Sequence, residues 1–193
     1  MNKYLDASAI IDWQQPAVLA KAVELANECD GDEAIAQACF NFVRDEIKHS
    51  LDYKRNPVTC SASQVLQHGT GYCYAKSHLL VALLRANSIP AGLCYQRLTI
   101  DHSVPPFCLH GLVAVYLKKH AWYRIDPRGN KPGVAAQFCP PQEKLAFPII
   151  IEGEADLPEI WPEPLEIVVE ALRQGRDYLD VANNLPDLEL IFT

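Results

Sequence analysis

The N-terminal quarter of the chain carries apolar residues at helical spacing. One apolar stripe follows Pro16 and predicts a first helix, which the pair Asp30-Gly31 breaks. Asp30 and Glu33 resemble a capping box, so a second amphipathic helix is expected from there to about His49. Each helix has one apolar face, which predicts that both cover one side of a core.

The strongest helical signal lies in the middle of the chain. The residues from Cys73 to about Asn87 are apolar around most of the helix circumference, which is typical of a buried helix. A polar, loop-like stretch precedes it. Within that stretch, the segment 61–67 predicts a short helix capped by Ser61 or Ser63.

Segments rich in valine and tyrosine follow the central helix and predict strands. The expected strands are 93–100, 109–117 and 121–125, with a further short one at 148–151. A turn at Lys118–His120 joins the second strand to the third as an antiparallel hairpin. A last helix is expected over 165–180. Helices packed on an antiparallel sheet constitute an α+β fold.

Length and composition favour one domain. The chain has 193 residues and no clear linker, so we expect a single domain over 1–193. Its parts are N-terminal helices (16–50), a core (61–130) and a C-terminal extension (131–193). Hydrophobic residues make up 49% of the chain, enough for a substantial core. The net charge of −7 argues against nucleic acid as a partner, because non-specific nucleic-acid binding needs a basic surface.

Nothing in the sequence indicates export or membrane insertion. The N-terminus shows no secretory signal, and no apolar run is long enough to span a bilayer. The seven cysteines have no paired spacing, which suggests reduced thiols. We therefore expect a cytoplasmic protein with no membrane partner. The pattern predicts no cofactor and no metal ion.

Among the cysteines, Cys73 has the setting of a nucleophile. It follows a turn that contains Gly69 and Gly71, and it begins the central helix, where free N–H groups and the helix dipole favour a thiolate. The same N–H groups can hold a developing oxyanion, so the backbone amide of Cys73 is one candidate donor. Cys39 lies inside a helix and Cys94 in a strand. The alternative is a buried cysteine at the start of a core helix.

A thiol nucleophile needs an imidazole within hydrogen-bond reach. Of the six histidines, His110 alone lies inside an apolar strand. The others are expected at solvated element ends (His49, His120), in loops (His68, His102) or off the cysteine's face of the central helix (His78). A lone strand histidine can also be purely structural.

Asp126 is expected close to His110, which favours a functional interpretation of this histidine. If 109–117 and 120–126 form a hairpin, position 110 faces about position 127. Asp126 is then a near neighbour of His110, and it can orient the imidazole. The alternative for Asp126 is an ordinary Asp-Pro turn residue.

Three blocks of the chain, taken in order, resemble the core of the transglutaminase-like superfamily. They are GTGYCYAKSHLLVALLRANSIPAGL, LHGLVAVYL and AWYRIDPRGN, which lie between Ala62 and Asn130, roughly a third of the chain. Members carry a glycine-preceded cysteine on a helix, then a strand histidine, then an aspartate after a tryptophan-containing strand. Here Asn87-Ser88 stands where a glycine is usual, a conservative departure in a turn.

The resemblance implies a papain-like α+β fold with the nucleophile at the N-terminus of the central helix, and thiol acyl-transfer chemistry. Cys73 would attack the carbonyl of a peptide, protein or small amide, His110 would move the proton, and Asp126 would hold the imidazole. The thioester would pass to water, as in a protease or amidase, or to an amine, as in a transglutaminase. A glutamine supplies an oxyanion donor in related cysteine proteases. Gln64 and Gln67 are therefore candidates, with a surface helix position as the alternative.

Two other function classes remain open. The superfamily includes members that lost the triad, so a catalytically silent fold that binds proteins is one alternative. Zinc binding by Cys73, His110 and Asp126, or by Cys108 with His110, is another, although close cysteine pairs are lacking.

No residue from Gly69 to Leu93 indicates which substrate is bound. The residues that determine substrate specificity are expected in the loops 101–106 and 127–148 or in the flanking regions.

Overall fold

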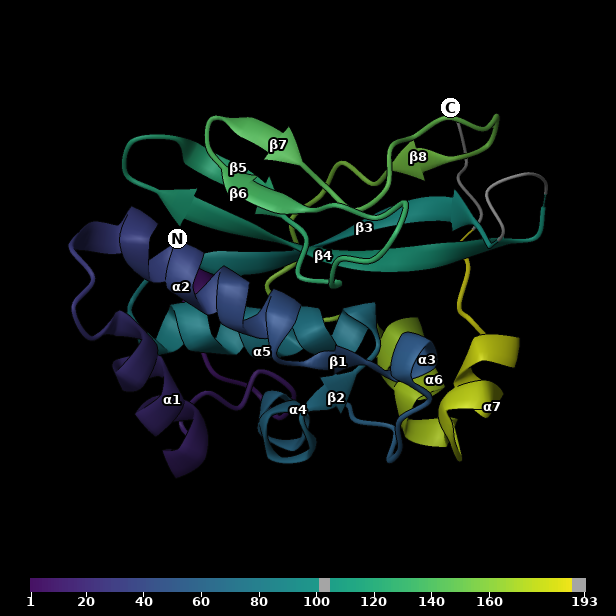
Figure 1. The fold of residues 1–193 in the computed structure, drawn as a ribbon, viewed down its shortest axis with the longest axis horizontal. Coiled ribbons are helices and arrows are strands. Elements are labelled where there is room, and N and C mark those ends of the chain that lie inside the picture. The colour runs from purple at the N-terminus through teal and green to yellow at the C-terminus, as the bar shows by residue number, and fades with distance from the viewer. Residues whose placement is uncertain (101–104, 189–193) are drawn as a thin grey trace.

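The computed structural model describes residues 1–100 and 105–188 and shows a layer of helices on an antiparallel sheet (Figure 1). This is the expected α+β arrangement. Among the described residues, no helix is long and apolar enough to cross a membrane.

The main sheet has four antiparallel strands in the order β5-β4-β3-β8. Their bounds are β3 (Ala91–Thr99), β4 (Phe107–Leu117), β5 (Ala121–Ile125) and β8 (Ala155–Asp156). The first three confirm the expected strands. In the β4–β5 hairpin Val113 faces Ile125, one position from the expected register. Since β5 ends at Ile125, the first half of β4 extends beyond it.

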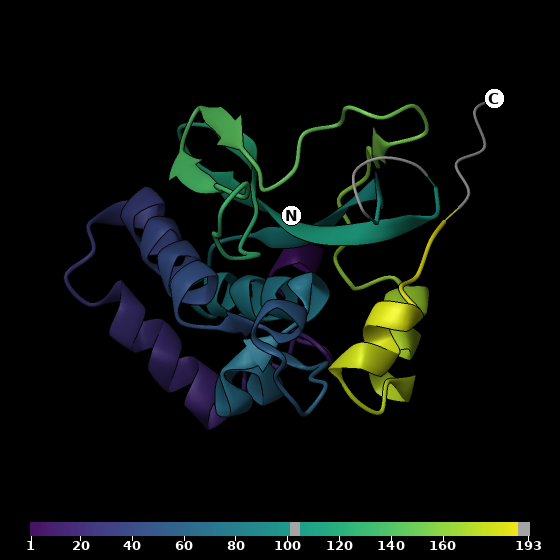
Figure 2. The ribbon, with the colours of Figure 1, turned by 45° about the vertical axis from the view of Figure 1, so that its right-hand side comes forward.

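The central helix α5 (Cys73–Ala86) lies against β3 and β4 and is buried at every residue except Ala86. Its other sides contact further helices. These are α1 (Pro16–Ala26) and α4 (Ala62–His68), which Figure 2 shows on the side away from the sheet, and α2 (Gly31–Asp45), which also contacts β4. The all-round apolar pattern of α5 is explained by this double contact.

Local signals set the ends of these helices. At α4, the cap is Ser61, one of the two serines expected, and it forms a capping box with Gln64. The capping box expected at Asp30 and Glu33 is wrong, because the Asp30 side chain makes no cap bond. Helix α2 also ends at Asp45, earlier than expected, since the chain leaves it to pair with another segment.

That pairing is a two-residue parallel ladder. The strands are β1 (Lys48–His49) and β2 (Thr70–Gly71). A one-turn helix, α3 (Ser50–Tyr53), follows β1 within the expected loop, and the 3-10 turn η1 (Asn2–Tyr4) lies at the N-terminus. The ladder joins the end of the N-terminal region to the turn before α5.

The C-terminal extension differs most from expectation. The strand expected at 148–151 is absent: Ile150 is 74% exposed, and the segment has no ladder. A hairpin, β6 (Gln137–Cys139) with β7 (Gln142–Lys144), was not foreseen. The expected last helix divides at Gly175 into α6 (Glu166–Gln174) and α7 (Tyr178–Asn183).

This extension packs back on the core beside the start of α5 and β4 (Figure 2). The Tyr72 hydroxyl donates to the carbonyl of Tyr178, and the Leu109 N–H donates to the carbonyl of Pro186 at 2.7 Å. Both contacts lie next to residues of the predicted site, Cys73 and His110.

Gly111 lets β4 approach the first turn of α5 closely. A Cβ at Gly111 would lie 3.0 Å from Tyr74 Cδ1 and 3.1 Å from Tyr74 Cα. The Tyr74 hydroxyl also donates to the carbonyl of Leu109. Contacts on both sides of His110 therefore fix its strand against the turn that carries Cys73.

We predict that Gly111→Ala destabilises the protein by about 1–3 kcal/mol, because the added methyl group overpacks against the Tyr74 backbone. Urea unfolding measures the loss. The variant should also slow alkylation of Cys73 by iodoacetamide in the folded protein, since β4 must move away from α5.

The matched control is Gly92→Ala on β3. There a Cβ would lie 2.5 Å from Ile160 Cγ2 and 2.9 Å from the Trp161 carbonyl oxygen. This variant should lose stability without a change in Cys73 alkylation. Wild-type stability in Gly111→Ala would contradict the close contact.

Candidate active site

Cys73 is held at the first position of α5 by the structure before it. Gly69 ends α4 in the left-handed conformation, with φ of +62°, and Gly71 pairs with His49 in the β1–β2 ladder. A Cβ at Gly71 would lie 3.1 Å from that of Ala75, so glycine allows this tight turn. The Cys73 side chain is nearly buried, and its backbone N–H belongs to the first helical turn, where such groups lack helical acceptors.

His110 and Asp126 are joined by a short hydrogen bond. His110 Nε2 donates to Asp126 Oδ2 at 2.8 Å, and both side chains are buried. Asp126 directly follows β5, so the hairpin brings the two residues together as predicted. Asp126 also accepts from the backbone N–H groups of Arg128 at 3.1 Å and Ala146 at 3.0 Å. These bonds fix the carboxylate from two loops.

The charges of the site favour a protonated His110. Burial by itself lowers the pKa of His110, but Asp126 and Cys73, through charge and hydrogen bonding, outweigh it and raise the pKa to about 10. Burial tends to raise the pKa of Asp126, yet His110 and the two backbone N–H groups hold it below the usual range. Because Nε2 donates its hydrogen bond to Asp126, Nδ1 is the ring nitrogen that can interact with Cys73.

Cys73 and His110 line one cavity of about 650 Å³. Much of its wall is apolar and comes from β3, β4 and two loops: Leu98, Ile100, Leu109, Val134, Phe147 and Ile150. The apolar run at 148–151 thus lies at a cavity wall and not in a strand. Residues 132–134 and 146–148 belong to the loop that was expected to choose the substrate, whereas 101–104 of the other loop, with His102, lie outside the described residues.

The oxyanion candidates differ in placement. The backbone N–H of Cys73 lies at the helix start. Gln64 Oε1 accepts from the backbone N–H groups of Cys60 and Ser61, so it caps α4. Gln67 is exposed on α4 and is not among the residues that line the cavity with Cys73.

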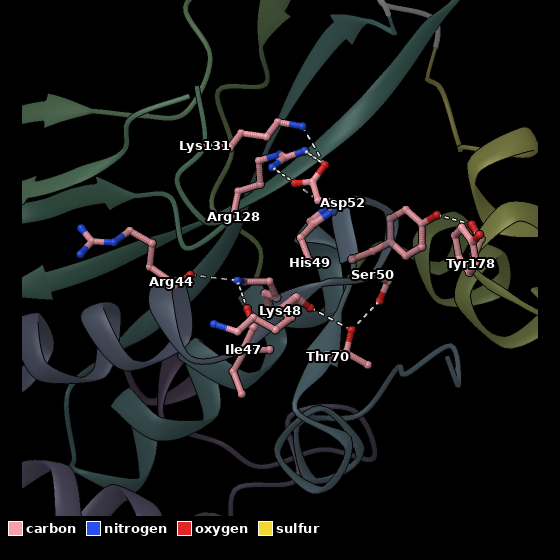
Figure 3. Close-up of polar contacts among 12 residues, drawn as sticks. Arg44, Ile47, Lys48, His49, Ser50, Asp52, Thr70, Arg128, Lys131 and Tyr178 are labelled. Atoms are coloured by element: carbon pink, nitrogen blue, oxygen red, sulfur yellow. Dashed lines mark hydrogen bonds and ion pairs between the residues drawn. The ribbon is translucent and has the colours of Figure 1, made fainter. Parts of the chain in front are cut away.

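Sequence reasoning missed His49. It was expected to be solvated, but its side chain is only 6% exposed and lines the same cavity as Cys73 and His110. Nearby, Asp52 binds the Arg128 guanidinium at 2.5 and 3.2 Å and Lys131 Nζ at 2.7 Å (Figure 3). The sequence Ile47-Lys48-His49 carries no apolar pattern that marks His49 as buried.

The other cysteines have different surroundings. All seven cysteines are free. Burial raises the pKa of four thiols to about 11 or 12, which disfavours their thiolates: Cys39, Cys60, Cys94 and Cys108. In the described part of the chain, no group of three or more His, Cys, Asp or Glu side chains could hold a metal ion.

Several solved structures are similar to part of the chain. A candidate cysteine protease from Cytophaga hutchinsonii matches with a TM-score of 0.52 and 20% identity over 65% of this chain and 40% of that chain. The periplasmic domain of TgpA from Pseudomonas aeruginosa matches with a TM-score of 0.47 and 19% identity, over 64% of this chain and 46% of that one. A candidate protease from Parabacteroides distasonis matches with a TM-score of 0.42 and 12% identity, over 64% of this chain and 24% of that chain. The chain spans less than half the length of each of these proteins.

No curated protein sequence matches the chain. A sequence profile described as the transglutaminase-like superfamily matches residues 20–127, which include Cys73, His110 and Asp126. The Cytophaga hutchinsonii structure shares the papain-like α+β fold. Because the profile match covers more than half of the chain, the chain belongs to the transglutaminase-like superfamily.

Proposed function

We propose that the protein catalyses thiol-dependent acyl transfer or hydrolysis on a peptide, protein or other amide, with Cys73, His110 and Asp126 as a catalytic triad. The observation that carries the proposal is the 2.8 Å hydrogen bond to the buried Asp126 from His110, which lines the same cavity as Cys73. A nucleophile, a base and a group that orients the base are the parts that such chemistry requires.

The reaction follows from the protonation state of the pair. In the reactive form, Cys73 is a thiolate and His110 an imidazolium whose charge Asp126 stabilises. The thiolate attacks the carbonyl carbon and gives a tetrahedral oxyanion, which the N–H of Cys73 can bind. As the C–N bond breaks, His110 gives its proton to the departing amine, and a thioester remains on Cys73.

The second half restores the protein. Water or an amine attacks the thioester and gives a proton to His110. Collapse of the second tetrahedral intermediate breaks the C–S bond and regenerates the thiolate–imidazolium pair. The apolar cavity wall favours acyl donors that carry an apolar group near the reacting carbonyl.

We predict that iodoacetamide alkylates Cys73 faster than any other cysteine. In His110→Ala the rate at Cys73 should fall by about 10²-fold, because the thiolate loses its counter-charge. Peptide mapping by mass spectrometry gives the rate at each cysteine. His120→Ala, which removes a histidine near Glu33 and outside this cavity, should alkylate like wild type. Equal reactivity at several cysteines would count against the triad.

We also predict that His110 stays protonated at neutral pH, with a titration midpoint of about 10 in the folded protein. NMR of labelled histidines measures this, and Asp126→Asn should lower the midpoint. Since the folded pKa lies above the unfolded value of 6.5, the stability contributed by the pair is complete below about pH 6.5 and is lost as pH rises through 10. A midpoint near 6.5 in wild type would contradict the pairing.

The activity itself is tested with a panel of acyl donors, namely activated esters, peptide anilides and glutamine peptides, each with and without an added amine. Wild type should turn over at least one donor, and Cys73→Ala should turn over none. The product then distinguishes hydrolysis from transfer. A fast-alkylating Cys73 with no turnover on any donor would instead favour the protein-binding alternative.

A further inference from the structure

The cavity contains a second histidine that the triad does not use. His49 lies on β1, directly opposite Gly71 in the parallel ladder, two residues before Cys73. Its ring packs edge-to-face against Tyr72, the N-cap residue of α5, with centroids 5.4 Å apart. The fold therefore holds the imidazole of His49 beside the turn that delivers the nucleophile.

His49 is buried without a hydrogen bond at Nδ1. That atom is enclosed, has no partner among the described residues, and lies 3.7 Å from Asp52 Oδ2, beyond hydrogen-bond distance. Asp52 is engaged by Arg128 and Lys131 instead (Figure 3). His49 lines the catalytic cavity, and its Nε2, unlike Nδ1, is not among the enclosed side-chain atoms that lack a partner.

The surroundings keep His49 neutral. Burial holds the pKa of His49 well below its usual range, and the positive charges of Arg128, Lys76 and His110 act in the same direction. Asp52 acts in the opposite direction, but Arg128 has the larger effect. A neutral imidazole carries one N–H, so the position of that proton decides what the ring can do.

The lack of an acceptor at Nδ1 indicates the tautomer. Asp52 Oδ2 lies 3.7 Å away, beyond hydrogen-bond distance, and the Asp52 carboxylate is held by Arg128 and Lys131. A proton on Nδ1 would therefore be a buried, unpaired N–H, which is costly, so the proton is expected at Nε2. His49 then presents an N–H donor toward the cavity.

We propose that the Nε2–H of His49 donates a hydrogen bond to the carbonyl oxygen of the acyl group on Cys73, as the second oxyanion donor beside the Cys73 backbone N–H. This inference rests on the proposed acyl-transfer function and assigns a further catalytic residue to it. A neutral, buried donor held by a ladder needs little reorganisation when the oxyanion forms, which is the condition under which such donors are effective. No bond to His49 forms or breaks.

The test separates oxyanion stabilisation from nucleophile activation. Acylation of Cys73 by p-nitrophenyl acetate passes through an oxyanion, whereas alkylation by iodoacetamide displaces iodide at a saturated carbon and forms none. In the full-length protein, His49→Ala should acylate about 10²-fold more slowly, as for loss of one oxyanion donor. Its alkylation rate should stay within about 3-fold of wild type.

Two further variants test which ring nitrogen acts. The amide nitrogen of glutamine reaches about as far as Nε2 of histidine, and that of asparagine about as far as Nδ1. His49→Gln should therefore regain much of the acylation rate, and His49→Asn should remain slow. His68→Ala, at an exposed position at the end of α4, is the control and should behave like wild type.

Three results would overturn the proposal: wild-type acylation in His49→Ala, a parallel loss of acylation and alkylation, or no recovery in His49→Gln. The parallel loss would show that His49 supports the site structurally. Failure of the proposed function has a different signature, because Cys73 of the wild-type protein itself would then not be acylated, whether or not iodoacetamide alkylates it, and the role of His49 would fail with it.

Discussion

The buried hydrogen bond between His110 and Asp126 is the constraint on which the site depends. A carboxylate with no exposed surface is costly unless charge and hydrogen bonds compensate it. His110 supplies the charge, and the N–H groups of Arg128 and Ala146 supply the further bonds. The two loops that carry those N–H groups are thereby drawn to one point, and together they form part of the cavity wall.

The same constraint couples the sheet to the helix. Strand β5 stops at Ile125, which frees the chain to place Asp126 beside His110. Gly111 and Tyr74 then hold β4 against the start of α5, so that His110 and Cys73 share one cavity. The proposed nucleophile comes from the helical layer and its proposed partners come from the sheet, and the contact between the two layers aligns them.

Most of this arrangement could be predicted because it is local. The apolar circumference of α5 and the β4–β5 hairpin are each encoded within a short stretch of sequence. The hairpin alone brings Asp126 close to His110. The ladder that buries His49 pairs 48–49 with 70–71, and no local signal reveals a contact between such distant, two-residue strands. The strand predicted at 148–151 was wrong for a related reason, since apolar residues are typical both of a strand and of a cavity wall.

The proposed triad requires Cys73 to carry the acyl group during the reaction. The most direct measurement is mass spectrometry of the wild-type protein after brief exposure to p-nitrophenyl acetate, with peptide mapping and neutral hydroxylamine, which cleaves thioesters. We predict an acetyl group on Cys73 that hydroxylamine removes, and little acetylation of the other cysteines. Acetylation spread over several cysteines, or none at Cys73, would contradict it.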